Sequence, residues 1–184
     1  GEVGEQVRER RRGGLDRAIA LAVEGQKEWN AGPLQEKIRI LERYALLGTG
    51  NVERIAGVMC EEGDKPIEQC RAKVYANAAM FRVYNAAAYT FYGKSLPYNG
   101  EPRSQGDVAF TIHEPLGVSA NIVPFNYPVE LAAHKLTPML ATGNSVVLMP
   151  STTTLRSPVV LVQLMHEEGV PGHTVSCVPG NASA

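Results

Sequence analysis

The 184-residue sequence lacks the features of several protein classes. It has no apolar run of about 18 residues, so no transmembrane helix is expected. Its charged N-terminal stretch lacks the apolar segment of a secretory signal. Its three cysteines have no disulfide-scaffold spacing, which favours a reducing, cytoplasmic compartment. The formal net charge of -1, from 18 basic and 19 acidic residues, gives no reason to expect a nucleic acid or membrane partner.

Short nucleotide-binding and metal-binding motifs are also missing. The chain contains no GxGxxG, no P-loop, no HExxH and no CxxC. The four histidines share no ligand spacing, so no metal site is expected. Cys60, Cys70 and Cys177 lie in or beside apolar stripes, and we interpret all three as core residues. Any nucleotide-binding prediction must therefore depend on architecture and resemblance.

Residues 14–92 carry the apolar periodicity of packed α-helices. One buried helix face is predicted from apolar residues three and four positions apart: Leu15, Ala18, Ile19 and Ala22. Further stripes are separated by breaks at 32–33, 48–51 and 63–66, where Gly and Pro gather. Residues 1–13 interleave arginine with glutamate, so we expect a charged tail rather than a phosphate-binding arm.

Residues 93–113 change to the composition of a β-hairpin. The first half contains Gly, Pro and Asn, which are typical of loops and turns. Asp107–His113 has the β-branched and aromatic content of a strand. A protruding hairpin exposes a strand edge, which a subunit contact can cover. We therefore expect an oligomerisation arm.

Residues 114–184 follow a βαβαβ pattern. Strands are predicted at 117–123, 145–149 and 174–178, with helices at 128–141 and 154–168. Right-handed crossovers place the strands in one parallel sheet. The fold class expected is α/β, with N-terminal helices packed on a Rossmann-like sheet, a protruding β-hairpin and an incomplete last domain. Ligands of such sheets bind beyond the carboxyl ends of the strands.

Several stretches, in order along the chain, resemble one family. They are EPLGV at 114–118, IVPFNYP at 122–128, KLTPMLATGN at 135–144 and VVLMP at 146–150, with Glu61–Ile67 similar to an E-x-G-K-P segment that Asp64 interrupts. Together they resemble the N-terminal portion of the aldehyde dehydrogenase superfamily, from about Leu15 to Gly180. The resemblance implies an aldehyde substrate, NAD or NADP as cofactor, and a homodimer or homotetramer.

The resemblance also implies which residues act. The family oxidises aldehydes through a thioester on a cysteine, and that cysteine and the general-base glutamate have no counterpart in these 184 residues, so the segment alone is expected to be inactive. Asn126 matches the family asparagine that stabilises the oxyanion; the alternative is a turn residue that caps the helix near Pro128. The implied cofactor-binding residues are Ile122, Val123, Pro124, Phe125, Asn126, Met149, Pro150, Ser151, Thr152 and Gly180.

Met149 and Thr152 depart from the family pattern. Lys and Glu usually stand at these positions and contact the adenosine ribose, so NAD and NADP both remain open. Some relatives, such as the CoA-acylating acetaldehyde branch, also lack this pair. The departure favours an alternative function, a truncated and catalytically inactive binding or interaction module. The intact strand-helix-strand unit and Asn126 favour the enzyme.

Overall fold

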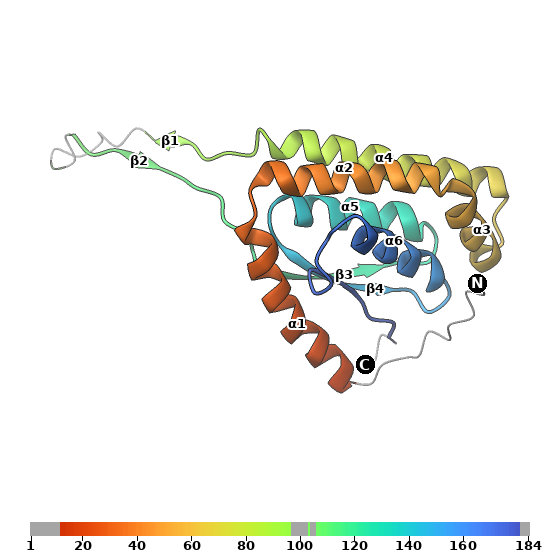
Figure 1. Cartoon of the computed structure of the whole chain (residues 1–184). Coiled ribbons are helices and arrows are strands. Elements are labelled where there is room, and N and C mark those ends of the chain that lie inside the picture. Colours follow the sequence, from red (N-terminus) through yellow and green to blue (C-terminus); the bar gives the residue numbers. More distant parts are fainter. Residues whose placement is uncertain (1–11, 97–102, 104–105, 181–184) are drawn as a thin grey trace.

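The computed structural model describes residues 12–96, 103 and 106–180. Along the chain, four helices precede a small parallel sheet with its crossover helices (Figure 1). The helices of the first half are α1 (Arg12–Ala31), α2 (Leu34–Gly50), α3 (Val52–Gly63) and α4 (Ile67–Ala88). The second half consists of β3 (Val118–Val123), α5 (Pro128–Ala141), β4 (Ser145–Pro150), α6 (Arg156–Glu167) and β5 (Val175–Cys177). Between the halves lie β1 (Ser95–Leu96) and β2 (Ala109–Phe110).

Proline and left-handed residues set most helix boundaries. Pro33 and Pro66 immediately precede α2 and α4, and Asp64 ends α3 in the left-handed conformation at φ 48°. The predicted break at 48–51 is wrong in part, because α2 continues to Gly50. The interruption is confined to Asn51, whose side-chain amide donates to the Leu47 carbonyl at 2.9 Å. That contact satisfies a carbonyl at the end of α2 and lets α3 follow at once.

The strands β3, β4 and β5 form one parallel sheet in that order. Val123 lies opposite Pro150, and Leu148 lies opposite Cys177. α5 and α6 are the crossover helices, as the sequence pattern predicts, and Gly143 (φ 83°) follows the end of α5. The α/β fold class, with helices on a parallel Rossmann-like sheet and a protruding hairpin, is therefore confirmed.

Helices cover both faces of the sheet. On one face, Val146, Leu148 and Val175 join the main core with α5 and α6, and beyond these lie α2, α3 and α4 (Figure 1). In that outer layer, the rings of Tyr44 and Phe81 pack with centroids 4.5 Å apart. The other face is covered by α1 alone in the described part of the chain.

Small side chains on α1 pack against the sheet. Ala18 and Ala22 pack against Val147 and Val178, and the Ser145 hydroxyl donates to the Ala22 carbonyl at 2.7 Å. The prediction that Ile19 belongs to this buried face is wrong, because its side chain is 42% exposed. The contact between α1 and the sheet is made by the helix face that carries Ala18 and Ala22. Ile19 lies beside this face, so its side chain points toward solvent.

The hairpin projects from the body as a thin two-stranded arm (Figure 1). Only two residues of each strand pair, which is shorter than the strand predicted at 107–113. His113 leaves the ladder and stacks on Phe91 with ring centroids 4.2 Å apart. Of the predicted segments, most of the charged tail, hairpin residues 97–102 and 104–105, and Asn181 lie outside the described residues.

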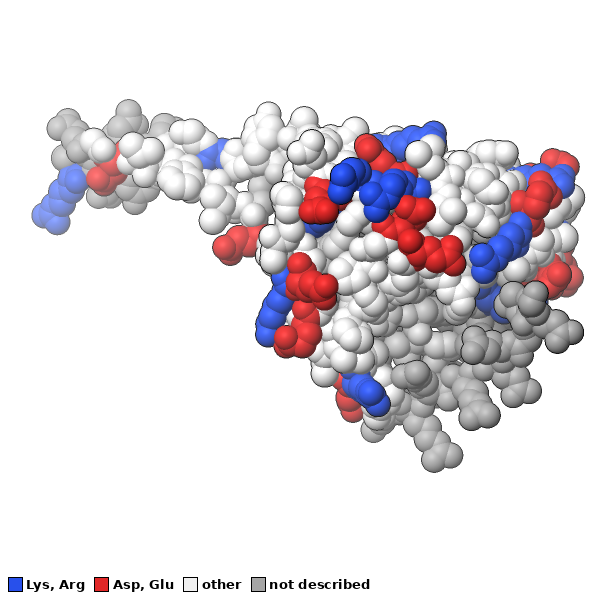
Figure 2. Space-filling model, viewed as in Figure 1, with Lys and Arg blue, Asp and Glu red and all other residues white. Residues whose placement is uncertain are grey.

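Acidic and basic side chains are mixed over the visible face of the body, without a large region of one sign (Figure 2). No helix within the described ranges combines the length and the hydropathy needed to cross a membrane.

Candidate functional site

The turns that follow β3 and β4 meet at one edge of the sheet. The two strands are parallel and end opposite each other, at Val123 and Pro150. The turn after β5 reaches the same edge, because a Cβ built on Gly180 would lie 3.7 Å from the Met149 sulfur. The predicted cofactor residues, which come from three separate stretches of sequence, are therefore brought together.

These residues divide into exposed and buried groups. Ile122 and Phe125 are 61% and 63% exposed, so the edge presents an apolar surface to solvent. Val123 and Pro150 are buried, so their side chains do not form part of this exposed surface. Met149, the register partner of Ile122, is half-buried. The carboxyl edge of the sheet thus combines an exposed apolar surface with the polar turns that follow β3 and β4.

Asn126 lies in the turn between β3 and α5. The N-cap position of α5 is Tyr127, and no side chain caps this helix. The alternative role for Asn126, a cap for α5, is therefore not seen, and its side chain is exposed to solvent. The residue is placed where its amide can donate to a ligand.

Lys65 holds this turn from outside the sheet. Its ammonium donates a hydrogen bond to the Asn126 carbonyl and lies 4.2 Å from the centroid of the Tyr127 ring. The Lys73 ammonium lies 4.4 Å from the same centroid and pairs with Glu130 at 2.6 Å, which raises the pKa of Lys73. Sequence reasoning did not include Lys65 in the site, although the similarity of Glu61–Ile67 to a family motif was the available signal.

The turn after β4 is organised by hydroxyl groups. Ser151 and Thr153 share a hydrogen bond of 2.9 Å between their hydroxyls, and the Thr154 amide donates to the Ser151 carbonyl at 3.2 Å. Thr152 is exposed at the outside of this turn. The hydroxyl of Thr152 is therefore available to a ligand.

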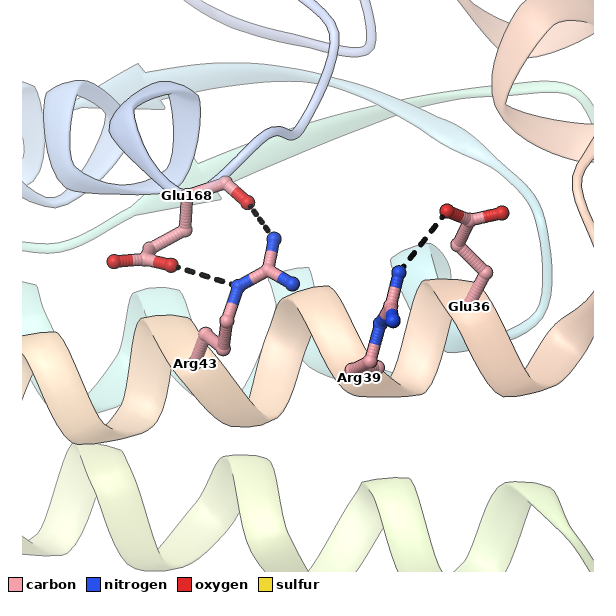
Figure 3. A network of polar contacts seen from close by, with 4 residues as sticks. All are labelled: Glu36, Arg39, Arg43 and Glu168. Carbon is pink, nitrogen blue, oxygen red and sulfur yellow. Dashed lines mark hydrogen bonds and ion pairs between the residues drawn. The ribbon is translucent and has the colours of Figure 1, made fainter.

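Charged side chains bind both ends of α6. The Glu62 carboxylate accepts hydrogen bonds from the amides of Arg156 and Ser157, the latter at 2.9 Å. At the other end, Arg43 donates to the Glu168 carboxylate at 3.0 Å and to the Glu168 carbonyl at 2.7 Å (Figure 3). An anion at the N-terminus and a cation at the C-terminus both match the helix dipole. The helix that follows the β4 turn is therefore fixed at both ends.

Two of the three cysteines, Cys70 and Cys177, are poorly suited to act as nucleophiles. Burial raises the pKa of Cys177 to about 12 and also raises the pKa of the fully buried Cys70. Both therefore remain thiols at neutral pH, and the thiolate is the reactive form. Within the described segments, no group of three His, Cys, Asp or Glu side chains is arranged to hold a metal ion.

A parallel sheet with helices on both faces, and with the predicted cofactor residues at its carboxyl edge, is typical of the Rossmann-like class of proteins. The chain belongs to the aldehyde dehydrogenase family, whose model matches residues 1–184. It is 33% identical over 169 residues to 3-sulfolactaldehyde dehydrogenase of Priestia aryabhattai, a match that covers 92% of this chain and 35% of the relative.

Solved structures agree with this assignment. PnpE in complex with nicotinamide adenine dinucleotide matches with a TM-score of 0.87 and 32% identity, over 92% of this chain and 34% of PnpE. NADP-dependent glyceraldehyde-3-phosphate dehydrogenase from Bacillus halodurans, complexed with NADP, matches with a TM-score of 0.87 and 32% identity, over 94% of this chain and 36% of that protein. The chain thus spans about 35% of its relatives, and the predicted resemblance to the family's N-terminal portion is confirmed.

Proposed function

We propose that the chain is the N-terminal, cofactor-binding part of an NAD(P)-dependent aldehyde dehydrogenase. The main support is the position of Asn126, which leaves its side chain exposed directly beside the apolar edge formed by Ile122 and Phe125. Family membership and the solved relatives with NAD and NADP support the same proposal.

In this proposal, a cysteine outside the 184 residues adds to the aldehyde carbon, and negative charge develops on the carbonyl oxygen. The Asn126 amide donates a hydrogen bond to that oxygen, a contact that strengthens as the charge grows. When bound, the dinucleotide accepts the hydride that the substrate carbon loses, which leaves a thioester on the cysteine. The segment on its own lacks the cysteine and the general base, so it has no turnover.

The residues present fit one part of the dinucleotide better than another. Ile122 and Phe125 offer exposed apolar surface to a base or ribose face. Ser151 and Thr152 offer hydroxyl groups, but Met149 offers no charged hydrogen-bond donor. The adenosine ribose is therefore held without a charged contact from Met149 or Thr152, and both NAD and NADP are compatible with this edge.

The arm supports a proposed homodimer or homotetramer. Val108, Phe110 and Ile112, which lie in or beside β2, are 83%, 69% and 68% exposed, and the ladder of this hairpin has only two residue pairs. Such a short hairpin with apolar side chains is poorly stable without a partner surface. Light scattering of the complete protein should give a dimer or tetramer, and Phe110→Asp should shift it toward the monomer.

The activity is tested with the complete protein, encoded by the full reading frame. Purified protein is mixed with a panel of aldehydes and with NAD or NADP, and the absorbance of the reduced nicotinamide is followed. The proposal predicts turnover with at least one aldehyde, and no turnover by the 184-residue segment under the same conditions. Failure of the complete protein with every aldehyde and both dinucleotides contradicts it.

A catalytically inactive binding or interaction module is the second candidate. Met149 and Thr152 favour it, because they provide neither charge that the family normally uses at the ribose. This candidate predicts dinucleotide binding or protein binding by the complete protein without aldehyde oxidation, which calorimetry and the same absorbance assay separate.

We further propose a cytoplasmic location, since all three cysteines are free thiols in the structure. Fractionation of cells that produce the protein should recover it with cytoplasmic markers.

A further inference from the structure

Residues 61–66, which comprise the end of α3 and the three residues that link it to α4 and are called the connector below, contact the turn after β3 and the helix that follows the turn after β4. We propose that this connector is a positioning element for the dinucleotide and oxyanion sites, with Glu62 and Lys65 as its positioning residues. The inference deepens the proposed dehydrogenase function and rests on it. Neither residue need touch substrate or cofactor, because each acts through a turn that does.

Glu62 acts through α6. Both of its carboxylate oxygens accept amide hydrogens from the first turn of that helix, at Arg156 and Ser157. The N-cap residue Leu155 is itself helical and provides no side-chain cap. Glu62 therefore satisfies amides that the local sequence leaves without partners. Fixing this first turn fixes the far end of the turn at 151–155, which carries the hydroxyls proposed to contact the ribose.

A second contact strengthens this attachment. The Arg156 guanidinium pairs with the Glu61 carboxylate at 2.7 Å. Two adjacent glutamates thus bind the backbone and the side chain of the same helical turn. The negative charge of Glu62 also lies at the positive end of the α6 dipole, so its removal weakens the attachment beyond the loss of one hydrogen bond.

Lys65 acts through the other turn. Its ammonium donates to the Asn126 carbonyl and lies over the Tyr127 ring, so one cation binds two successive residues. The peptide that joins Asn126 to Tyr127 is thereby held in one orientation. Because the direction of the Asn126 carboxamide depends on that backbone, Lys65 sets where the proposed oxyanion donor points.

The chain reverses between the two residues. Asp64 takes the left-handed conformation at φ 48°, and it is the one non-glycine residue with positive φ in the described part of the chain. Pro66 then immediately precedes α4. This reversal lets Glu62 face α6 while Lys65, three positions later, faces the β3 turn. The connector therefore holds the turns after β3 and β4 in a fixed arrangement. These two turns are proposed to bind different parts of the ligand.

The two contacts predict opposite kinetic signatures in the complete enzyme. Glu62→Gln should raise the KM for the dinucleotide about fivefold and leave kcat within twofold, because it loosens the turn at the ribose. Lys65→Met should lower kcat about tenfold and leave that KM within twofold, because it frees the oxyanion donor. Lys65→Arg keeps a cation at this position and should recover most of the lost kcat.

Matched controls separate positioning from general destabilisation. Glu53→Gln removes a surface carboxylate that pairs with Arg71 in the same helix layer, and Lys27→Met removes a surface ammonium that pairs with Glu24. Both should leave kcat and KM unchanged. Thermal unfolding of every variant gives the folded fraction, which corrects kcat.

The experiment is steady-state kinetics of the complete protein and these variants, with a substrate aldehyde and its preferred dinucleotide. The expected result is a raised KM for the dinucleotide in Glu62→Gln and a lowered kcat in Lys65→Met, with kcat largely recovered in Lys65→Arg. An active wild-type protein whose Glu62 and Lys65 variants match the controls, or lose activity only with the folded fraction, overturns the inference and leaves the proposed function standing. A wild-type protein that oxidises no aldehyde overturns the proposed function and the inference with it.

Discussion

Gly25 of α1 lies directly against the backbone of Thr174, the residue that precedes β5. The Thr174 hydroxyl donates to the Gly25 carbonyl at 3.2 Å, and a Cβ built on Gly25 would lie 2.6 Å from the Thr174 nitrogen. The same Cβ would lie 2.3 Å from the His173 carbonyl carbon. Because no real side chain fits at these distances, glycine sets how closely α1 approaches the sheet.

Gly25→Ala should therefore lower the free energy of unfolding by about 1 to 3 kcal/mol, the usual cost of overpacking. Urea denaturation of the 184-residue chain measures it. The matched control is Gly57→Ala in α3, where an added Cβ meets nothing within 4 Å. That change should stabilise the protein by about 0.5 to 1 kcal/mol through helix propensity. Equal effects at the two positions contradict the close approach of α1.

Alkaline pH should destabilise the protein through Tyr44. This tyrosine is fully buried, its hydroxyl lies 3.3 Å from the Asn77 side-chain oxygen, and burial raises its pKa. Above pH 10, the ordinary pKa of tyrosine, the unfolded state loses the proton while the folded state retains it. The folded state then binds more protons, so the free energy of unfolding falls as pH rises.

Tyr44→Phe should cost about 1 kcal/mol at pH 7 because it removes one buried hydrogen bond. Its free energy of unfolding should then decline less steeply than that of the wild-type protein above pH 10. Denaturation series at several alkaline pH values give both quantities. Parallel curves for the two proteins argue against titration of Tyr44.

The three thiols should react at different rates in the folded protein. Cys70 is fully buried, whereas Cys60 and Cys177 are both partly exposed. Of these two, Cys177 has a raised pKa that keeps its thiol protonated at pH 8. We expect one rapid modification by iodoacetamide, at Cys60, which peptide mass spectrometry locates. Cys60→Ser should abolish the rapid phase. A rapid phase that survives this substitution contradicts the protection of the other two thiols, through burial at Cys70 and through the raised pKa at Cys177.

Charge at position 149 should control dinucleotide affinity in the complete protein. Met149→Lys introduces an ammonium beside Gly180 at the ribose edge. A hydrogen bond to a charged group contributes about 1.5 to 3 kcal/mol, so the Kd for the dinucleotide should fall at least tenfold. The gain should be larger for NADP, whose extra phosphate attracts the cation. Val83→Lys, at an exposed position on α4, is the control for added charge. Equal affinities of the Met149 and Val83 variants place the adenosine elsewhere.

Local signals predicted the second half of the fold well. The bounds of α5 follow from Pro128 at its start and from Gly143 soon after its end. Both signals are local in the sequence. The placement of the three strands in one parallel sheet followed from the crossover rule. These features need no knowledge of distant contacts.

Features that depend on tertiary contacts were predicted poorly. Ile19 has the spacing of a buried residue, yet the alanines beside it make the contact with the sheet. The contact of Lys65 with Asn126 joins residues 61 positions apart, and nothing in the separate stretches indicates it. The cap that Glu62 provides for α6 spans 95 positions to Ser157. The resemblance identified the residues at the edge of the sheet, but not the connector that holds them.

The most direct measurement is the kcat of Asn126→Ala in the complete protein, with a substrate aldehyde and saturating dinucleotide. Removal of one oxyanion donor lowers kcat by about 10²- to 10³-fold in other enzymes. The proposed oxyanion role of Asn126 predicts a loss of that size, with the KM for the dinucleotide within twofold of the wild-type value and with unchanged thermal stability. A variant that retains the wild-type kcat contradicts this role, because the β3 turn then does not hold the developing oxyanion.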